Sequence, residues 1–474
     1  MGSFCSTRDS IITDDFEINS YKKQRKELIK KFNHNQFLKK LYLKNNNDFK
    51  KYKNNIKYLA DTIKKLSIKE NFDYYQCLSC ILGAFYGDAL GNNVEFEPKN
   101  ENNHKLIYGE NKYNIQPGEI TDDSEMAISL SFAILDNGNL YELNQNLLYF
   151  YYGAWYTTNN PNIGISTKKA LQNFSFDKCS IEDKNLFSDK LKDRINKENK
   201  DTKANGFLMR ISTLVVWFYF RFKNYIINVL QNNDSDEFYE LYKKIHEQVS
   251  IDTSITHPNK ENSIACAIFV FMSLSAILKN NNIIIIEQLK TLLNNKNFLN
   301  QSNNTDFINV KNLILNSLTN FEDKNFDKNK FFDTTNKQGY YGHAFKLTLY
   351  YLFIFKNIPE TTEITKYRYI INEICDFGGD VDTNCAIVGT VLGPLIGYNN
   401  FDKKDFDTFI YHINEDKSRI LFAASYMYLY IKYLDISNKE KKIVLNELRY
   451  NVYNLFIILL SSEINEEIID KMFN

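Results

Sequence analysis

The chain has 474 residues and a mass of 55.8 kDa, and its 58 Lys and Arg balance its 58 Asp and Glu. This length suits one large domain or two to three ordinary ones. With 43% hydrophobic and 15% aromatic residues, the composition excludes a globally disordered chain. Only 6 prolines and 17 glycines interrupt it, which disfavours an all-β protein with many tight turns and favours long helices.

Seven cysteines are scattered through the chain. An odd number at irregular spacing argues against a secreted disulfide framework and favours a reducing compartment. The longest apolar run, residues 267–278, falls short of the ~20 residues that cross a bilayer, so we expect no spanning helix. Charged residues interrupt the N-terminus before any apolar secretory core forms.

The net charge of zero conceals a basic N-terminal segment, because residues 21–70 contain 16 Lys and Arg against 4 Asp and Glu. Apolar residues recur there at near-helical spacing, which predicts a basic amphipathic helix. Such a helix packs on the main domain or meets a membrane surface. Nucleic acid is not expected as a partner, because no binding motif accompanies the charge. We therefore divide the chain into an extension, 1–70, and a main domain, 71–474.

The first six residues, Met-Gly-Ser-Phe-Cys-Ser, match a signal for N-myristoylation at Gly2. One myristoyl chain binds membranes only marginally, at about 10⁴ M⁻¹, and needs a second signal. Palmitate on Cys5 or attraction of the basic segment to anionic lipid would supply it. We expect a cytoplasmic protein that associates with a membrane through this N-terminus.

Apolar residues at helical spacing dominate the main domain. They predict helices over 76–90, 124–135, 140–156, 204–222, 264–278, 342–355 and 382–396. Polar stretches between them read as surface insertions, at 178–203, 231–238, 295–307 and 320–337. The expected fold is therefore all-α, a single large helical domain with insertions.

The first of these predicted helices contains an acidic residue among small ones. Residues 83, 84, 87, 89 and 91 are Gly or Ala, so this helix can pack tightly against a neighbour and bury Asp88. Because a buried acid without a partner is costly, Asp88 either caps a nearby backbone end or orders a metal site. Cys77 and Cys80 have redox or zinc spacing, but no second Cys or His pair lies suitably near, and we expect buried structural thiols.

Two adjacent carboxylates begin the next predicted helix, in the sequence Thr121-Asp122-Asp123-Ser124-Glu125. One acid at a helix N-terminus is explained by capping and by the helix dipole. Adjacent carboxylates repel each other unless a cation holds them together, which makes a hard divalent metal a reasonable hypothesis.

A second acidic segment, Gly378-Gly379-Asp380-Val381-Asp382-Thr383, begins the predicted helix 382–396. Two glycines permit a sharp turn, after which oxygen atoms project from a helix N-terminus. A calcium EF-hand loop is excluded because Cys385 and Val391 stand where it needs Gly and Glu. A haloacid-dehalogenase-type phosphatase is disfavoured because the preceding residues 370–374 read as a helix. Gly389 and Gly393 indicate close packing on another helix.

Taken together, these segments resemble the ADP-ribosylglycohydrolase family. The matching segments, in order, are Gly87-Asp88-Ala89-Leu90-Gly91 with Glu95, Thr121-Asp122-Asp123-Ser124, Asn205-Gly206 with Met209-Arg210, Thr256-His257-Pro258 and Gly378-Gly379-Asp380-Val381-Asp382-Thr383. The resemblance covers about residues 73–435. It departs from the family where Ala204 precedes Asn205 in place of a glycine, and where Val381 separates the two aspartates.

The resemblance implies an orthogonal helical bundle with a binuclear Mg²⁺ or Mn²⁺ site. Carried over by position, the metal ligands are Thr121, Asp122, Asp123, Asp380, Asp382 and Thr383. The substrate-binding residues are Asn205, Gly206, His257, Gly378 and Gly379. Glu95 and Asp123 are the candidates for handling a proton, although a carboxylate that binds a metal cannot serve as a free base.

The implied reaction is hydrolysis of the bond between C1″ of ADP-ribose and the group it modifies, with the arginine linkage favoured on family prevalence. The expected partners are ADP-ribosylated proteins and ADP-ribose. The alternative is an inactive relative that binds ADP-ribose or serves a structural role. Loss of the acidic residues would favour that alternative, and here they are all present.

Overall fold

In the computed structural model of the chain, the described residues are 74–107, 118–137, 142–157, 162–175, 179, 183, 185–278, 281–299, 305–361, 363–403, 405, 406 and 409. The basic extension and Gly2 lie outside them. Every regular element of the described residues is helical, and an isolated antiparallel bridge joins Ala204 to Tyr340. The predicted all-α class is confirmed.

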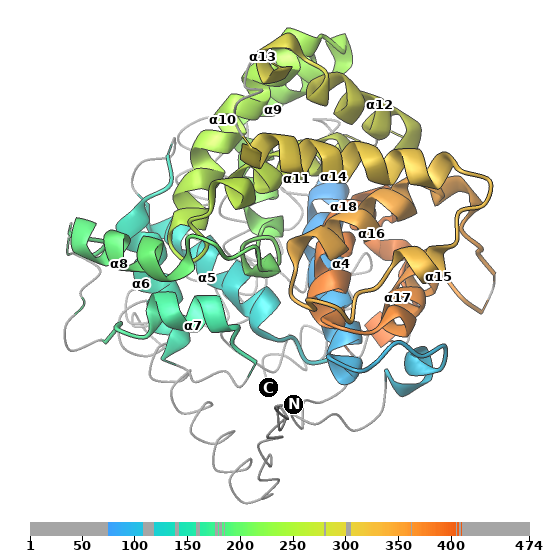
Figure 1. The fold of residues 1–474 in the computed structure, drawn as a ribbon, viewed down its shortest axis with the longest axis horizontal. Coiled ribbons are helices and arrows are strands. Elements are labelled where there is room, and N and C mark those ends of the chain that lie inside the picture. Colours follow the sequence, from blue (N-terminus) through green and yellow to red (C-terminus); the bar gives the residue numbers. More distant parts are fainter. Residues whose placement is uncertain are drawn as a thin grey trace, which may run out of the picture.

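The helices follow one another in the order shown by the colours of Figure 1. The first half contains α4 (Tyr74–Gly91), η2 (Asn92–Val94), η3 (Asn103–Leu106), α5 (Asp122–Asp136), α6 (Gln145–Tyr156), α7 (Ile165–Leu171), α8 (Asp189–Asn199), η4 (Asn205–Phe207), α9 (Ser212–Asn232) and α10 (Ser235–Ser254). The second half contains α11 (Lys260–Ile277), α12 (Asn282–Leu293), α13 (Lys296–Leu299), α14 (Thr305–Glu322), α15 (Lys328–Phe331), α16 (Tyr341–Phe353), η5 (Phe355–Asn357), α17 (Lys366–Phe377), α18 (Val381–Ile396) and η6 (Tyr398–Asn400).

Helices from opposite ends of the described chain lie side by side, as the blue α4 and the orange α18 show in Figure 1. Their backbones touch through glycines: a Cβ atom on Gly389 would lie 2.2 Å from the carbonyl oxygen of Gly83. A Cβ atom on Gly393 would lie 2.1 Å from the carbonyl oxygen of Ser79. The predicted close packing of these glycines is confirmed, and it brings the N-terminus of α18 beside the C-terminal half of α4.

Other helices surround this central pair. Helices α5, α9 and α11 pack on α4, and α11, α16 and α17 pack on α18. Helix α11 is apolar all round and buried. It is long and apolar enough to cross a membrane by length and composition, but 94% of that window is buried inside the protein. An apolar composition of this kind is expected for a helix that is buried in the core of a bundle.

Several predicted boundaries need correction. The helix expected over 204–222 begins only at Ser212 and continues to Asn232, because Ala204 is extended and bridged to Tyr340. The helix expected from residue 140 begins at Gln145, where Asn144 accepts hydrogen bonds from the amides of Asn146 and Leu147. The polar stretch 178–203 contains α8.

The stretch 231–238, expected to be an insertion, is a tight junction between two helices. Asn233 adopts a left-handed conformation at the end of α9, and the Asp234 side chain caps α10. Helices α10, α12 and α14 were not among the predicted elements, and in α10 and α14 many polar residues dilute the apolar signal.

Candidate active site

Asp88, on α4, caps a helix that belongs to a different part of the sequence. Its carboxylate is fully buried and accepts hydrogen bonds from the amides of Thr121 at 3.0 Å and Ser124 at 3.2 Å. The Thr121 hydroxyl also donates to it, at 2.7 Å. Asp88 therefore satisfies amides that begin α5, a role that side chains next to a helix usually perform. The prediction of a buried acid that caps a backbone end is confirmed.

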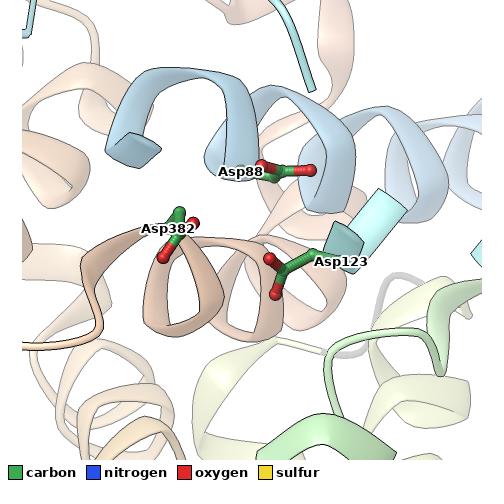
Figure 2. A group of neighbouring side chains, drawn as sticks. All are labelled: Asp88, Asp123 and Asp382. Atoms are coloured by element: carbon green, nitrogen blue, oxygen red, sulfur yellow. The ribbon is translucent and has the colours of Figure 1, made fainter. Parts of the chain in front are cut away.

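The acidic segments before α5 and α18 meet beside Asp88. Figure 2 shows the carboxylates of Asp88, Asp123 and Asp382 turned toward the space between α4 and the start of α18, and one oxygen atom of each lies within 4.8 Å of the others. A second group with the same spacing is formed by Glu95, Asp380 and Asp382. Asp382 belongs to both groups, so the carboxylates form one continuous buried cluster.

Hydrogen bonds hold these carboxylates in place. The Thr121 hydroxyl lies 3.0 Å from Oδ2 of Asp123, and the amide of Thr383 donates to Oδ1 of Asp382 at 2.9 Å. The amide side chain of Asn205 donates to Asp380 at 2.8 Å. Asn162 donates to Glu95 at 3.3 Å. Thr121 and Thr383 are local donors, whereas Asn205 and Asn162 come from distant parts of the chain, so both local and tertiary structure fix the acidic cluster.

Burial and mutual repulsion raise the pKa values of these carboxyl groups. The pKa of Asp123 lies well above its ordinary value, first because of burial and then because of the neighbouring Asp88 and Asp380. For Asp382 burial is again the larger cause, followed by repulsion from Glu95 and Asp123. Oδ1 of Asp123 is buried and has no hydrogen-bond partner among the residues that the structure describes.

A buried carboxylate oxygen without a donor is costly. Hard divalent cations such as Mg²⁺ and Mn²⁺ take carboxylate and hydroxyl oxygens, which are the groups gathered here. The residues present therefore fit such cations. Asp122 is also buried, and burial together with Asp123 raises its pKa, but it is not part of either group of three carboxylates.

The glycines before α18 form a turn that packs against backbone. Gly378 and Gly379 have positive φ angles of 74° and 77°. A Cβ atom on Gly379 would lie 2.2 Å from the carbonyl oxygen of Thr334. The turn is clamped to the segment after Glu95 by a hydrogen bond from the Phe96 amide to the Gly379 carbonyl, at 2.6 Å. Glycine is required here on conformational and steric grounds alone.

Asn205, Gly206 and His257 lie together on another side of the cluster. Gly206 faces the His257 ring, since a Cβ atom on it would lie 2.8 Å from Cε1 of that ring. The amide of Asn205 donates to the carbonyl of Gly339 at 2.8 Å. Asn205 thus joins this group to Asp380, and the predicted substrate-binding residues Asn205, Gly206 and His257 are neighbours.

One buried acid beside the site was not found from the sequence. Asp252 forms a fully buried ion pair with Arg210, at 3.0 Å, from 42 positions away. Glu125, the third acid of the segment that begins α5, accepts a hydrogen bond from the Trp155 indole at 2.9 Å. Asp252 lies in a helix with polar and apolar residues intermixed, so no local signal separates it from the surface acids of α10.

Fold and site together define an all-α protein with a buried carboxylate centre. The profile of the ADP-ribosylglycohydrolase family matches residues 73–406, and the chain belongs to that family. The family is one of hydrolases, and the resemblance found in the sequence motifs is confirmed.

Among similar proteins, one of Acanthamoeba polyphaga mimivirus, whose name assigns it provisionally to the ADP-ribosyl glycohydrolases, is 27% identical over 67% of this chain and 86% of its own. An ADP-ribosylarginine hydrolase of Serratia proteamaculans is 28% identical over 23% of this chain and 30% of its own. The ADP-ribosyl-dinitrogen reductase glycohydrolase of Rhodospirillum rubrum is 37% identical over 14% of this chain and 24% of its own.

A solved structure, described as an ADP-ribosylglycohydrolase-related protein complex, matches 81% of this chain and 99% of its own at 15% identity, with a TM-score of 0.44.

Proposed function

We propose that this protein is a divalent-metal-dependent hydrolase that removes ADP-ribose from modified proteins by cleaving the bond at C1″. The observation that carries the proposal is the buried carboxylate cluster, in which Asp123, Asp382 and Asp88 share one space and Glu95, Asp380 and Asp382 another. Such a concentration of buried negative charge is unfavourable unless cations bind there.

The proposed ligands are those expected from the family resemblance. Oxygen atoms of Asp122, Asp123, Asp380 and Asp382 would hold two cations, Mg²⁺ or Mn²⁺, with the hydroxyls of Thr121 and Thr383. When bound, the cations supply positive charge that orients the ribose hydroxyls and raises the acidity of the attacking water. Asp88 keeps Thr121 and the start of α5 in position through the hydrogen bonds that it accepts.

Glu95 is the group that we assign to proton handling. Its carboxylate lies at the edge of the cluster beside Asp380 and Asp382, and it accepts a hydrogen bond from Asn162. Asp123, the other candidate, is a proposed metal ligand and cannot hold a proton while it binds a cation. As water adds to C1″ and the bond to the modified side chain breaks, Glu95 would take the proton of the water and pass it to the leaving side chain, so that Glu95 ends as a carboxylate again.

The arginine linkage is the favoured substrate. An ADP-ribosylarginine hydrolase is among the similar proteins, although the match spans less than a third of either chain. The second candidate function, an ADP-ribose-binding relative without activity, would be favoured by loss of the acidic residues. Asp122, Asp123, Asp380 and Asp382 are all retained, so activity is the better supported proposal.

The test is release of free ADP-ribose from arginine-modified and serine-modified proteins, with Mg²⁺, with Mn²⁺ and with a chelator. We expect metal-dependent release, and Asp382→Asn should lower it by at least about 10²-fold, because this carboxylate belongs to both groups. Asp193→Asn, an exposed acid on α8, is the matched control and should leave release unchanged. Absence of release from both linkages would refute the proposal.

A further inference from the structure

Arg210 is the largest fully buried side chain of the described residues, and all of its donors are used. Nε and Nη2 donate to Oδ2 of Asp252 at 3.1 and 3.0 Å, and Nη2 also reaches the Asp252 carbonyl at 3.1 Å. Nη1 donates to the Gly206 carbonyl at 3.3 Å and to the Thr256 hydroxyl at 2.9 Å. The guanidinium also lies over the Tyr152 ring, 4.5 Å from its centre.

A buried ion pair is weak grounds for stability. Well-packed apolar residues of similar volume often give a fold equal or greater stability, because burying an ion pair requires that two charges be removed from water. What the fork geometry of Arg210 adds is a fixed direction for each hydrogen bond. Two of these bonds leave the ion pair and end at Gly206 and at Thr256, which lie next to the proposed substrate-binding residues Asn205 and His257.

Thr256 connects Arg210 to His257 through hydrogen bonds of its hydroxyl group. Its hydroxyl accepts from Arg210 and lies 2.8 Å from Nδ1 of His257. Thr256 is fully buried. Among the described residues, Nδ1 of His257 is the acceptor that the hydroxyl proton of Thr256 reaches. Burial and the Arg210 charge lower the pKa of His257 to about 3, so the ring is neutral at physiological pH. With Nδ1 as acceptor, the single ring proton is on Nε2, the atom next to Gly206.

The backbone of this segment is also fixed from outside. The Asn199 side chain donates to the Thr256 carbonyl at 2.8 Å, and the Asn262 side chain donates to the His257 carbonyl at 3.3 Å. No hydrogen bond joins Nε2 to another of the described residues, whereas Nδ1 is occupied by Thr256. The N–H at Nε2 is therefore available to an acceptor oxygen of a ligand.

We propose that the Arg210–Asp252 pair is a positioning device for the substrate side of the site. Through Thr256 it holds His257 as the neutral tautomer with an N–H at Nε2, and through the Gly206 carbonyl it holds the turn that ties Asn205 to Asp380. The acceptor that His257 would meet is an oxygen of ADP-ribose, and this part rests on the proposed function. Arg210, Asp252 and Thr256 act through other residues and do not touch the substrate.

The test compares Thr256→Val with Thr256→Ser in the full chain. Valine keeps the volume and removes the hydroxyl, whereas serine keeps the hydroxyl. Solid-state NMR of protein labelled with nitrogen-15 histidine reports the tautomer, and the His257 signal is assigned by its loss in His257→Gln. We expect the Nε2–H tautomer in the wild type and in Thr256→Ser, and a mixture of tautomers in Thr256→Val.

The second measurement is the affinity for free ADP-ribose, measured by calorimetry in the presence of Mg²⁺. Thr256→Val should bind about tenfold more weakly, the equivalent of one poorly oriented hydrogen bond, and Thr256→Ser should bind as the wild type does. In turnover, KM should rise more than kcat falls. A second variant, Arg210→Met with Asp252→Leu, replaces the pair by apolar residues and should fold yet lose the tautomer preference.

An unchanged tautomer in Thr256→Val would overturn the proposal, as would a changed tautomer with unchanged affinity. Equal loss of affinity in Thr256→Ser would also overturn it, because the hydroxyl would then not be the cause. The NMR measurement needs no ligand and no turnover. Failure of the proposed enzymatic function is therefore recognised separately, as absent ADP-ribose release by a wild type that still shows the Nε2–H tautomer.

Discussion

Phe96 adopts a backbone conformation that aromatic residues rarely occupy, with a φ angle of 61°. It immediately follows Glu95, and its amide is tied to the Gly379 carbonyl at 2.6 Å. Strain of this kind persists where the surrounding structure imposes it. At Phe96 the neighbouring backbone imposes the left-handed conformation, and this is the point at which the chain turns Glu95 toward Asp380 and Asp382.

We predict that Phe96→Gly preserves or raises stability while lowering activity. Glycine relieves about 1 kcal/mol of left-handed strain, but it loosens the segment that orients Glu95, and ADP-ribose release should fall by about tenfold. Thermal unfolding and release rates measure the two effects. Asn233→Gly is the control, because Asn233 has a φ angle of 57° at the end of α9 and its amide donates to the Val229 carbonyl of the same helix. A Phe96→Gly variant with the full rate would contradict this account.

His257 should make the protein less stable in acid. Its pKa is lowered to about 3 in the folded protein, whereas the unfolded chain has an ordinary value of 6.5. Between these values the unfolded state binds a proton that the folded state does not, so stability falls as the pH drops below 6.5. The contribution is at most about 1.4 kcal/mol per pH unit.

Urea unfolding at pH 7, 6, 5 and 4 measures this effect, with His257→Gln as the comparison. The variant should be less stable at pH 7, since it loses the Thr256 contact, but its stability should decline less steeply between pH 6.5 and pH 4. Parallel curves for the two proteins would show that His257 does not titrate as its burial requires.

At the scale of elements, the contact between α4 and α18 leaves no room for a side chain. We predict that Gly389→Ala destabilises the protein by about 2 kcal/mol or more, because the new Cβ atom would lie 2.2 Å from the Gly83 carbonyl oxygen. Gly164→Ala is the matched control, since nothing lies within 4 Å of its added Cβ atom. Urea midpoints measure both. Equal urea midpoints for the two variants would show that α4 and α18 move apart to admit the methyl group without a loss of stability.

The sequence predicted elements and residues whose signals are local. Apolar periodicity identified α4, α11, α16 and α18 nearly to their ends, and the small residues of α4 predicted its close packing. Asp88 was expected to be buried because small residues flank it. The extended conformation of Ala204 was not expected, because it depends on a bridge to Tyr340, 136 positions later.

Pairings between distant residues could not be predicted for the same reason. Asn162 donates to Glu95 from 67 positions away, and Asp252 neutralises Arg210 from 42 positions away. Nothing in the local pattern of Asp252 distinguishes it from the many other Asp residues of the chain, and no local pattern pairs Asn162 with Glu95. The motifs include Glu95 and Arg210, and the fold shows which residues pair with them.

For the whole molecule, we predict that divalent cations raise the thermal stability. The buried carboxylates repel one another, so a cation that binds only the folded state stabilises it, by about 2.7 kcal/mol at a hundredfold excess over its Kd. Differential scanning fluorimetry with Mg²⁺, Mn²⁺ or sodium at equal ionic strength measures the shift. Asp382→Asn should reduce it. A midpoint that divalent cations and chelator leave unchanged would argue against a metal centre.

The proposal of a lipidated N-terminus concerns the chain as a whole and lies outside the described residues. If Gly2 is myristoylated and the basic segment 21–70 meets anionic lipid, the wild type should fractionate with membranes and Gly2→Ala should be released. Fractionation of cells that express the two full-length proteins measures this. Identical distributions would contradict the proposal.

The glycine contact between α4 and α18 also bears on which ion the centre would accept. Because backbone meets backbone there, the spacing between the two helices is set by van der Waals radii and cannot adjust by repacking of side chains. Asp88 of α4 also holds the start of α5, to which Asp123 belongs, so a cation between Asp123 and Asp382 would meet a cage of nearly fixed width. Such rigidity discriminates by ionic radius, and it favours Mg²⁺ or Mn²⁺ over the larger Ca²⁺, which needs more oxygens at longer distances.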